Sequence, residues 1–562
     1  MRRNTTAAAT PRQLIFSAGA CGAHRPRCAP NSERRAMAEY GDGDAISNEE
    51  RAADLHARAE VIRRDMGGAS KVRAMNEEGD RTIRQHIDAL LDPGTFREIG
   101  TFSRSIRPEM RDVTPGDGKV GGHGEVDGRP VTVFGDDITV LRGSSAIVGT
   151  RKESRLYDRA LTMGIPIVHF GETGGGRIPD LMGSEGISEP GAMFEMAQRR
   201  HRVPMATMIC GQSFGGSSFL SAMSDYVVMV RGSCLAVTSP KVFEIATGEV
   251  ISFEDVGGVD VHSRITGQID LGVETDEEGY AAIRRWLSFM PTNAWEPAPR
   301  AEPCGDDDPD PELGKMVPAR RTRGYDMRRV VARICDPGSV FEMQPNYARN
   351  IVCALARLDG YPVGVIANNP MFSAGTLDPQ ACHKVIRLAT VCDSYNIPML
   401  FLVDVPGFMV GKRVEHDLML HWGIRMMHAL QNASAPTLTV CLRKAFGMAW
   451  QAMNGSRMPS HGIYCWPGAE IGFMDPEVGV NVAFGSRLGR IADADEREAE
   501  RLKLVAEVAE ATNPYEAAGT MRIDEMIDPA DTRRVLISDI RMLANRPVPP
   551  PAERPLSYWP SC

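Results

Sequence analysis

The sequence repeats itself at a constant spacing. Asp127-Gly128-Arg129-Pro130-Val131 returns as Asp359-Gly360-Tyr361-Pro362-Val363, 232 positions further along the chain. Shorter pairs follow at the same spacing: Gly164-Ile165-Pro166 with Asn396-Ile397-Pro398, Val203-Pro204 with Ala435-Pro436, and Phe214-Gly215 with Phe446-Gly447. A register held without a gap over roughly 90 residues indicates two copies of one fold. The recurring positions lie at turns between apolar runs, where proteins commonly carry functional residues.

A second echo helps to divide the chain into domains. Asp92-Pro93-Gly94-Thr95 returns as Asp336-Pro337-Gly338-Ser339, but 244 positions later, so the copies differ by 12 residues between this turn and the first strand. Residues 296–311 are dense in proline and acid, which excludes the interior of a helix or strand. We therefore predict a linker at about 296–316, between a first domain at 37–311 with a helical lead-in and a second domain at 312–562.

Each copy alternates short apolar runs with helical stretches. We expect strands at 130–134, 165–170 and 205–210, and a helix at 151–163. The second copy of that helix predicts a single buried stripe, made of Val385, Leu388, Cys392 and Tyr395. Continuous apolar strands that alternate with helices predict the α/β fold class.

Charged segments flank the two copies. The pattern at 48–91 predicts an N-terminal helical extension, and the pattern at 492–508 predicts a charged amphipathic helix that packs as an arm or is solvated. The first 36 residues carry seven arginines and one acid, Glu33, which is typical of a mitochondrial transit peptide. The alternative is that Met37 is the true start and that the upstream segment is disordered. We therefore expect a cytoplasmic protein, with the mitochondrial matrix as the alternative.

Composition excludes several classes of function. A net charge of −9 disfavours binding to nucleic acid, because no overall basic field faces the phosphates. No apolar stretch approaches the ~18 residues that span a bilayer, so we expect no membrane segment. The twelve cysteines are scattered without a Cys-x-x-Cys motif, which favours a reducing compartment and predicts no metal site. Cys210, inside an apolar run, is interpreted as a small hydrophobic residue.

Two turns in the repeated register predict chemistry. The strand ending near Cys210 leads through Gly215-Gly216-Ser217 into the helical run 219–223. Backbone N–H groups at a helix start have no intrahelical acceptor, and two of them suit an oxyanion. The alternative is a tight turn that packs helix on strand. Because Gly447-Met448-Ala449 lies at the same register, we expect two carbonyl oxygens to be stabilised in one reaction.

Longer motifs place the chain near a known family. They are Gly128-Arg129-Pro130-Val131, Thr173-Gly174-Gly175-Gly176-Arg177-Ile178, Phe401-Leu402-Val403-Asp404-Val405-Pro406-Gly407-Phe408, Arg443-Lys444-Ala445-Phe446-Gly447, Asn513-Pro514-Tyr515 and Ile523-Asp524. With them the chain, from about residue 50 to 545, resembles the carboxyltransferase (β) subunits of biotin-dependent acyl-CoA carboxylases, such as the propionyl-CoA and methylcrotonyl-CoA enzymes of fatty-acid and branched-chain acid metabolism. The resemblance implies two tandem crotonase-like domains (the ClpP/crotonase superhelix of ββα units). It also implies a homo-oligomer, usually a hexamer built as a ring of dimers.

The resemblance also assigns the site. It implies that the amides of Gly216 and Ser217 bind the thioester oxygen of acyl-CoA, and that those of Met448 and Ala449 receive the ureido oxygen of carboxybiotin. It adds a substrate-binding set: Gly174, Gly175, Gly176, Gly215, Gly447 and Gln451. The family's site lies at a dimer interface, between the first domain of one subunit and the second domain of another. The chain lacks the biotinyl-lysine motif A-M-K-M, so carboxybiotin must arrive on a biotin carboxylase or biotin carrier (α) subunit.

The chain departs from the family at a few of these positions. Met448 replaces the second glycine of the usual Gly-Gly-Ala turn, Ser217 replaces the alanine of the first turn, and Gln451 stands where propionyl-CoA enzymes commonly have Asp. These departures leave open an acyl-CoA decarboxylase of the same fold or a catalytically altered paralogue. Arg443 and Lys444 are interpreted as solvated basic residues, with CoA phosphates as the alternative partner, and His262 as structural rather than a proton carrier.

Overall fold

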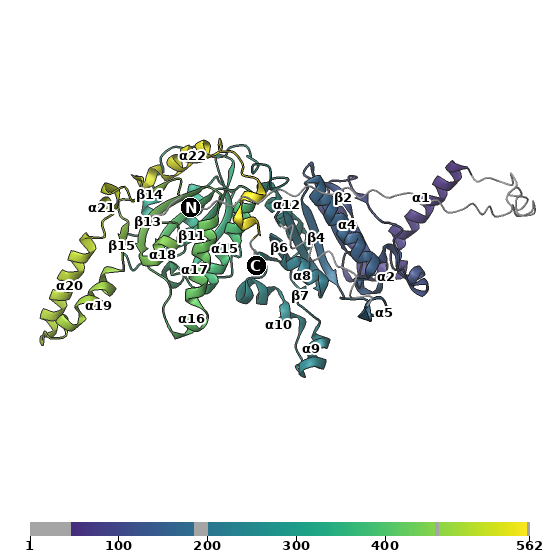
Figure 1. The fold of residues 1–562 in the computed structure, drawn as a ribbon, viewed down its shortest axis with the longest axis horizontal. Coiled ribbons are helices and arrows are strands. Elements are labelled where there is room, and N and C mark those ends of the chain that lie inside the picture. The colour runs from purple at the N-terminus through teal and green to yellow at the C-terminus, as the bar shows by residue number, and fades with distance from the viewer. Residues whose placement is uncertain (1–46, 185–200, 456–459, 559–562) are drawn as a thin grey trace, which may run out of the picture. The chain divides into compact units, whose positions relative to one another are not determined.

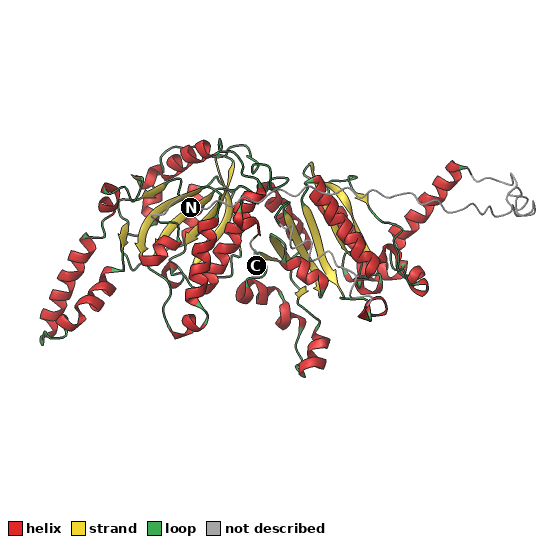
Figure 2. Ribbon diagram, viewed as in Figure 1, coloured by secondary structure: helices red, strands yellow, loops and turns green. Residues whose placement is uncertain are grey.

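The computed structural model describes residues 47–184, 201–455 and 460–558, so the predicted N-terminal segment 1–36 lies outside the described residues. The described residues form two sheets with helices packed around them (Figures 1 and 2). Each sheet has eight strands, and the strand order is the same in both. The first sheet runs β1-β2-β3-β4-β5-β6-β8 with β7 beside β5, and the second runs β9-β10-β11-β12-β13-β14-β16 with β15 beside β13. In the first sheet β1 to β3 pair antiparallel and the rest pair parallel.

The strands are short, as the apolar runs predicted. The first sheet consists of β1 (Arg97–Glu98), β2 (Lys119–Val126), β3 (Arg129–Asp136), β4 (Ile167–Thr173), β5 (Met205–Ser213), β6 (Tyr226–Val230), β7 (Cys234–Leu235) and β8 (Leu271–Val273). The second consists of β9 (Phe341–Met343), β10 (Ile351–Leu358), β11 (Tyr361–Asn368), β12 (Met399–Val405), β13 (Thr437–Phe446), β14 (Ile463–Cys465), β15 (Glu470–Gly472) and β16 (Glu525–Met526). The three expected strands correspond to β3, β4 and β5.

The spacing of the repeat is confirmed strand by strand. Strands β2 to β5 each begin 232 positions before β10 to β13, whereas β1 begins 244 positions before β9. The 12 additional residues of the first copy therefore lie between β1 and β2, in residues 99–118. The two copies are an α/β fold repeated in tandem.

One side chain explains why two separate motifs recur. The hairpin turn Asp127-Gly128 has φ of 51° and 73°, and Asp359-Gly360 has 52° and 78°, the positive values that a tight hairpin turn needs. The Asp92 carboxylate accepts from the N–H groups of Asp127 (3.1 Å) and Gly128 (2.7 Å). Asp336 clamps the second hairpin in the same way, at 3.0 and 2.8 Å.

Helices cover both faces of each sheet. In the first copy α4 (Ile147–Met163) and α8 (Gly216–Ala222) pack on one face, and α3 (Ile83–Leu90) and α12 (Asp276–Phe289) pack on the other. In the second copy α15 (Pro379–Ser394) and α17 (Met419–Asn432) oppose α14 (Met327–Ile334) and α22 (Thr532–Leu543). The predicted helix at 151–163 is confirmed within α4.

The other α-helices of the described residues lie before, between and after these elements. They are α1 (Asn48–Asp65), α2 (Ala69–Glu78), α5 (Ile178–Leu181), α9 (Pro240–Thr247), α10 (Phe253–Gly257), α11 (Val259–Val261), α13 (Leu313–Met316), α16 (Lys412–His416), α18 (Gly447–Ala452), α19 (Pro476–Leu488), α20 (Ala494–Glu510) and α21 (Pro514–Gly519). The helical lead-in and the charged C-terminal helix are both present. From residue 290 to 312 the chain forms neither helix nor strand, and α13 follows inside the predicted linker.

Helix α15 differs from its prediction. Val385, Leu388, Cys392 and Tyr395 are buried as expected, but so is every residue of α15 except Gln380 and His383. The prediction of one buried stripe is therefore wrong, because the helix is covered on nearly every side. Its charged residues are satisfied internally: Lys384 Nζ donates to the carbonyls of Gln344, Tyr347 and Ile351 at 2.8 to 3.0 Å.

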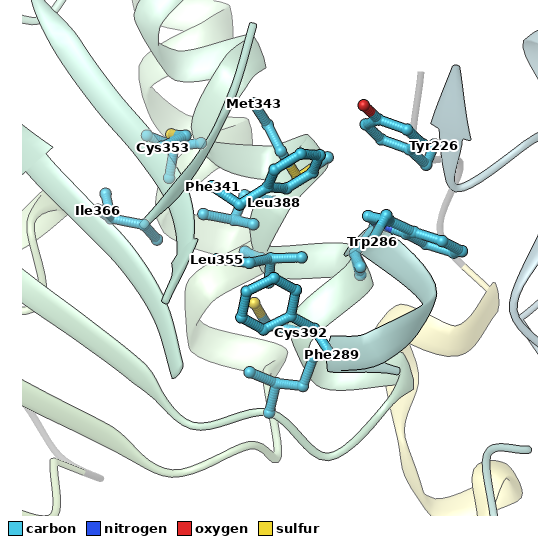
Figure 3. Close-up of a cluster of buried hydrophobic side chains, with 14 of the residues drawn as sticks. Tyr226, Trp286, Phe289, Phe341, Met343, Cys353, Leu355, Ile366, Leu388 and Cys392 are labelled. Atoms are coloured by element: carbon cyan, nitrogen blue, oxygen red, sulfur yellow. The ribbon is translucent and has the colours of Figure 1, made fainter. Parts of the chain in front are cut away.

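A shared apolar core and an ion pair join the two copies. Tyr226 of β6 stacks on Trp286 of α12 at 5.5 Å between ring centroids, and lies 5.6 Å from Phe341 of β9 (Figure 3). Arg387 of α15 donates to both oxygens of Asp270, at 2.8 and 2.6 Å. Both side chains of this pair are buried.

Replacement of Arg387 by methionine tests the ion pair. It leaves Asp270 buried without its countercharge, so we expect a loss of about 3–5 kcal/mol in the free energy of unfolding. Urea denaturation followed by tryptophan fluorescence measures the loss. Arg413→Met is the control, because Arg413 is 91% exposed beside Asp417 and should cost less than about 1 kcal/mol. Equal losses in the two variants would contradict the assignment.

Candidate active site

The first predicted turn has the geometry of a helix start with free donors. Strand β5 ends at Ser213, Gly215 has φ 60° and ψ −131°, and α8 begins at Gly216. This backbone conformation is accessible to glycine and strained for other residues. Within the described residues, no acceptor is bound by the N–H groups of Gly216 and Ser217. The turn therefore presents two adjacent donors.

The second predicted turn repeats this arrangement. Strand β13 ends at Phe446, Gly447 has φ 59°, and α18 begins there. The N–H groups of Met448 and Ala449 also lack a partner among the residues that the structure describes. Met448 is 53% exposed, so its side chain lies beside the donors instead of in the core, whereas Ala449 is buried. Gln451 is exposed one turn further along α18.

A loop from the neighbouring strand lies beside the first turn. A Cβ on Gly215 would be 3.9 Å from the Cα of Gly175, which places the predicted Gly174-Gly175-Gly176 segment next to the donors. The loop is held by Ser145, whose N–H donates to the Gly175 carbonyl at 2.8 Å. In the second copy the Leu377 N–H donates to the Gly407 carbonyl at 3.1 Å, so Pro406-Gly407-Phe408 is the equivalent loop.

The predicted site residues thus form two groups. Gly174, Gly175, Gly176, Gly215, Gly216 and Ser217 gather at the ends of β4 and β5, and Gly447, Met448, Ala449 and Gln451 gather at the end of β13. Across the described part of the chain, no hydrogen bond or ion pair joins the two groups. Their assignment to a substrate stays a prediction.

The solvated reading of Arg443 and Lys444 is wrong. Arg443 is buried, pairs with Asp404 at 2.9 Å through Nε, and donates through Nη1 to the carbonyls of Pro318, Arg320 and Arg323. Lys444 is buried 3.7 Å from the same carboxylate, and burial lowers the pKa of Lys444. Neither residue is exposed to bind a CoA phosphate, because both side chains are directed to the buried carboxylate of Asp404.

His262 is held at both ring nitrogens. Nε2 lies 2.7 Å from the Leu235 carbonyl and Nδ1 lies 2.9 Å from Thr266 Oγ1. The ring is buried, and burial lowers the pKa of His262 below its usual value. This environment supports the structural role.

A carboxylate that the motifs did not single out lies at the end of the fourth strand in each copy. Glu172 of β4 and Asp404 of β12 are 232 positions apart, so the spacing of the repeat could have found the pair. Asp404 is neutralised by Arg443, but Glu172 forms no ion pair with any described residue. Burial, followed by the nearby Asp80 and Asp276, raises the pKa of Glu172 to about 8. Cys210 packs against the apolar core, as interpreted from the sequence, and it also lies beside Glu172 and lines a cavity.

Two sheets of one strand order, each with a glycine turn that opens a helix, define a tandem crotonase-like enzyme. A family model, the carboxyl transferase domain, matches residues 74–555, and the chain belongs to that family. It is a carboxyltransferase subunit of the biotin-dependent acyl-CoA carboxylase kind.

Named relatives support this membership. The chain is 38% identical to the propionyl-CoA carboxylase carboxyltransferase subunit of Haloferax mediterranei, over 85% of this chain and 93% of the relative. It is 34% identical to the methylmalonyl-CoA decarboxylase α subunit of Veillonella parvula, over 85% and 93% of the two chains. A solved structure of the hexameric transcarboxylase 12S, with methylmalonyl-CoA and methylmalonic acid bound, superposes with a TM-score of 0.84 at 35% identity, covering 89% of this chain and 96% of that one. Within the described ranges, no helix combines the length and apolar character of a membrane span.

Alanine substitutions test the two turns. Gly215→Ala and Gly447→Ala each force an L-residue into a positive φ, and a Cβ at Gly447 would also lie 2.9 Å from the Phe473 carbonyl oxygen. We expect each to lower the free energy of unfolding by about 1–3 kcal/mol. Gly468→Ala is the control, because no atom lies within 4 Å of its Cβ position, and it should stay within about 0.5 kcal/mol of the parent. Thermal or urea unfolding measures all three, and a neutral Gly447→Ala would refute the assigned conformation.

Proposed function

We propose that this chain transfers a carboxyl group from carboxybiotin, carried by a partner subunit, to the α-carbon of an acyl-CoA. The observation that carries the proposal is the pair of equivalent turns, each with two unpartnered N–H donors at a helix start. The thioester oxygen gains negative charge as the α-carbon loses its proton and becomes an enolate. The N–H groups of Gly216 and Ser217 are assigned to that oxygen, since fixed donors stabilise developing charge without reorganisation.

The second turn is assigned to the other half of the reaction. The N–H groups of Met448 and Ala449 would donate to the ureido oxygen, on which negative charge grows as CO₂ departs. The enolate carbon then forms its bond to CO₂, so no covalent intermediate with the protein is needed. Gly174, Gly175, Gly176, Gly215, Gly447 and Gln451 are proposed to line the paths of the two substrates.

We further propose a homo-oligomer in which two subunits complete each site. The first turn of one subunit would face the second turn of another, as the resemblance to the family implies. Phe473, whose carbonyl lies beside Gly447 of the second turn, is 83% exposed, an apolar character that suits contact with another subunit. The hexamer of the transcarboxylase 12S relative favours the same number of subunits here, with a biotin carboxylase or biotin carrier subunit as the further partner.

Proline substitutions test the donors one at a time. Ser217→Pro deletes one N–H in the first turn of α8, a position where a helix tolerates proline. We expect the exchange of the α-proton of propionyl-CoA with solvent to slow by about 10²–10³-fold. Ser217→Ala keeps the N–H and serves as the matched control with nearly unchanged exchange. In the second turn, Ala449→Pro against Ala449→Gly should show the same contrast in the decarboxylation of free carboxybiotin. The proposal fails if each proline variant slows both half-reactions equally.

Replacement of Met448 tests the departure in the second turn. The side chain stands where the ureido ring would enter, so Met448→Gly should raise kcat/KM for free carboxybiotin several-fold and leave the order of preference among acyl-CoA substrates unchanged. Initial rates at varied concentrations of free carboxybiotin give kcat/KM, and an acyl-CoA panel gives the order of preference, in both proteins. The control is Met163→Gly at the last residue of α4, because Met163 is similarly half-exposed. Unchanged rates in Met448→Gly would show that the Met448 side chain does not affect the entry of the ureido ring.

The similarity to a methylmalonyl-CoA decarboxylase subunit supports a second candidate function. The same two turns would serve a decarboxylase, in which the carboxyl group moves from acyl-CoA towards biotin. Labelled methylmalonyl-CoA and labelled carboxybiotin distinguish the two directions: label that reaches acyl-CoA in the presence of the carrier supports carboxylation, and label that leaves methylmalonyl-CoA supports decarboxylation.

A further inference from the structure

The two copies treat the carboxylate at the end of their fourth strand differently. In the second copy Asp404 is enclosed by basic residues, with Arg443 at 2.9 Å and Lys444 at 3.7 Å. At the equivalent positions of the first copy, 232 residues earlier, stand Gly211 and Gln212. Glu172 occupies the space left by that glycine, because a Cβ on Gly211 would be 2.1 Å from Glu172 Oε1. The first copy therefore lacks the countercharge that the second copy supplies from its own chain.

An imidazole and a thiol, instead of basic side chains, lie next to Glu172. His86 of α3 and Cys210 of β5 each place a ligand atom within 4.8 Å of the Glu172 carboxylate and of one another. The second copy has Val330 and Leu442 at the equivalent positions, 244 and 232 residues later, and both are buried apolar residues. Where the second copy has two basic residues and an apolar wall, the first copy has imidazole and thiol.

The His86 ring is already oriented. Its Nδ1 lies 2.6 Å from the Tyr280 hydroxyl, so Nε2 is the nitrogen left for a further partner. A hydrogen bond to one ring nitrogen that orients the imidazole is typical of histidines that bind a metal ion through the other nitrogen.

The space around the three residues is open to solvent, and no described basic side chain compensates the charge of the Glu172 carboxylate. A cavity of about 670 Å³ is lined by His86, Glu172 and Cys210 together with Asp276. Of the four arginine and lysine side chains that also line it, Arg142 forms no ion pair with Glu172 and the other three are paired elsewhere. Lys71 donates to the Thr139 carbonyl, Arg81 pairs with Glu277, and Arg231 pairs with Glu274. A mobile cation can therefore reach Glu172, and no described basic side chain has taken its place.

We propose that a divalent transition-metal ion binds in this cavity to His86, Glu172 and Cys210, with water or Asp276 as the fourth ligand. One nitrogen, one carboxylate oxygen and one thiolate form a ligand set that suits Zn²⁺ and, in its place, Co²⁺. The Cys210 thiol and the Glu172 carboxyl, whose pKa burial raises to about 8, release their protons to solvent when the metal–sulfur and metal–oxygen bonds form, and no oxidation or reduction takes place. Two anionic ligands and one neutral ligand then balance the charge of the ion.

The ion would join three segments of the first copy. It would tie α3 to the carboxyl ends of β4 and β5, directly before the Gly174-Gly175-Gly176 loop and the Gly215 turn. This role does not depend on the identity of the acyl-CoA substrate or on the direction of carboxyl transfer.

Cobalt binding by the full-length protein tests the proposal. Metal-free protein, prepared with a chelator, is titrated with Co²⁺ and followed by the sulfur-to-cobalt charge-transfer absorption in the near ultraviolet. We expect one equivalent to bind with this absorption, and Zn²⁺ to displace it. Cys210→Ser should abolish the charge-transfer band, and Glu172→Gln, which keeps the shape of the side chain, should weaken binding at least tenfold.

Cys234→Ser is the matched control, because Cys234 is a buried cysteine of the neighbouring strand β7 outside the cluster. It should bind Co²⁺ like the parent. The unfolding temperature of the parent should rise with Zn²⁺, and that of Cys210→Ser should not. The proposal is overturned if the parent shows no charge-transfer band at one equivalent, or if Cys210→Ser keeps the band.

Discussion

Asp270 and Arg387 bury opposite charges where the two copies meet, and the position of α15 depends on this pair. A helix can be enclosed on nearly every side only if its charged side chains find partners, because an isolated buried charge costs several kcal/mol. Arg387 meets this condition through Asp270 of the first copy, and Lys384 through three carbonyls of the second. The burial of α15 is therefore coupled to the presence of the first copy. One apolar core extends through both copies.

The two copies share a backbone fold, but equivalent residues differ in burial and in their partners. Lys152 and Lys384 are 232 positions apart, and both donate to carbonyls that precede or begin the second strand of their sheet. Arg155 and Arg387 are equivalent in the same way, yet Arg155 is exposed and Arg387 is buried. The equivalent helices α4 and α15 therefore differ in burial: α4 is partly exposed on the first sheet, whereas α15 lies in the core.

This contrast explains which features the sequence could predict. The spacing of 232 positions can be read directly, so the strands, the tandem α/β fold and the two glycine turns were predictable from local pattern and turn chemistry. The clamp by Asp92 was visible only as two unrelated motifs, because the contact joins residues 35 positions apart. The burial of Arg443 and Arg387 could not be predicted from pattern, since their partners lie 39 and 117 positions away and basic side chains are ordinarily solvated. His86, Glu172 and Cys210 come from three separate segments, and only the fold brings them together.

The carboxylates at the fourth strands connect these observations to the turns. In the second copy Asp404 accepts from the Lys444 backbone N–H at 3.3 Å and pairs with Arg443, so it ties β12 to the strand that leads into Gly447. In the first copy Gly211 and Gln212 supply neither charge, and Glu172 is left between β4 and β5 without this tie. Equivalent pairs of N–H donors are therefore supported by different electrostatics. A metal ion at Glu172 would restore the missing tie with a removable charge, which makes the rigidity of the first turn responsive to metal while that of the second is fixed by the chain itself.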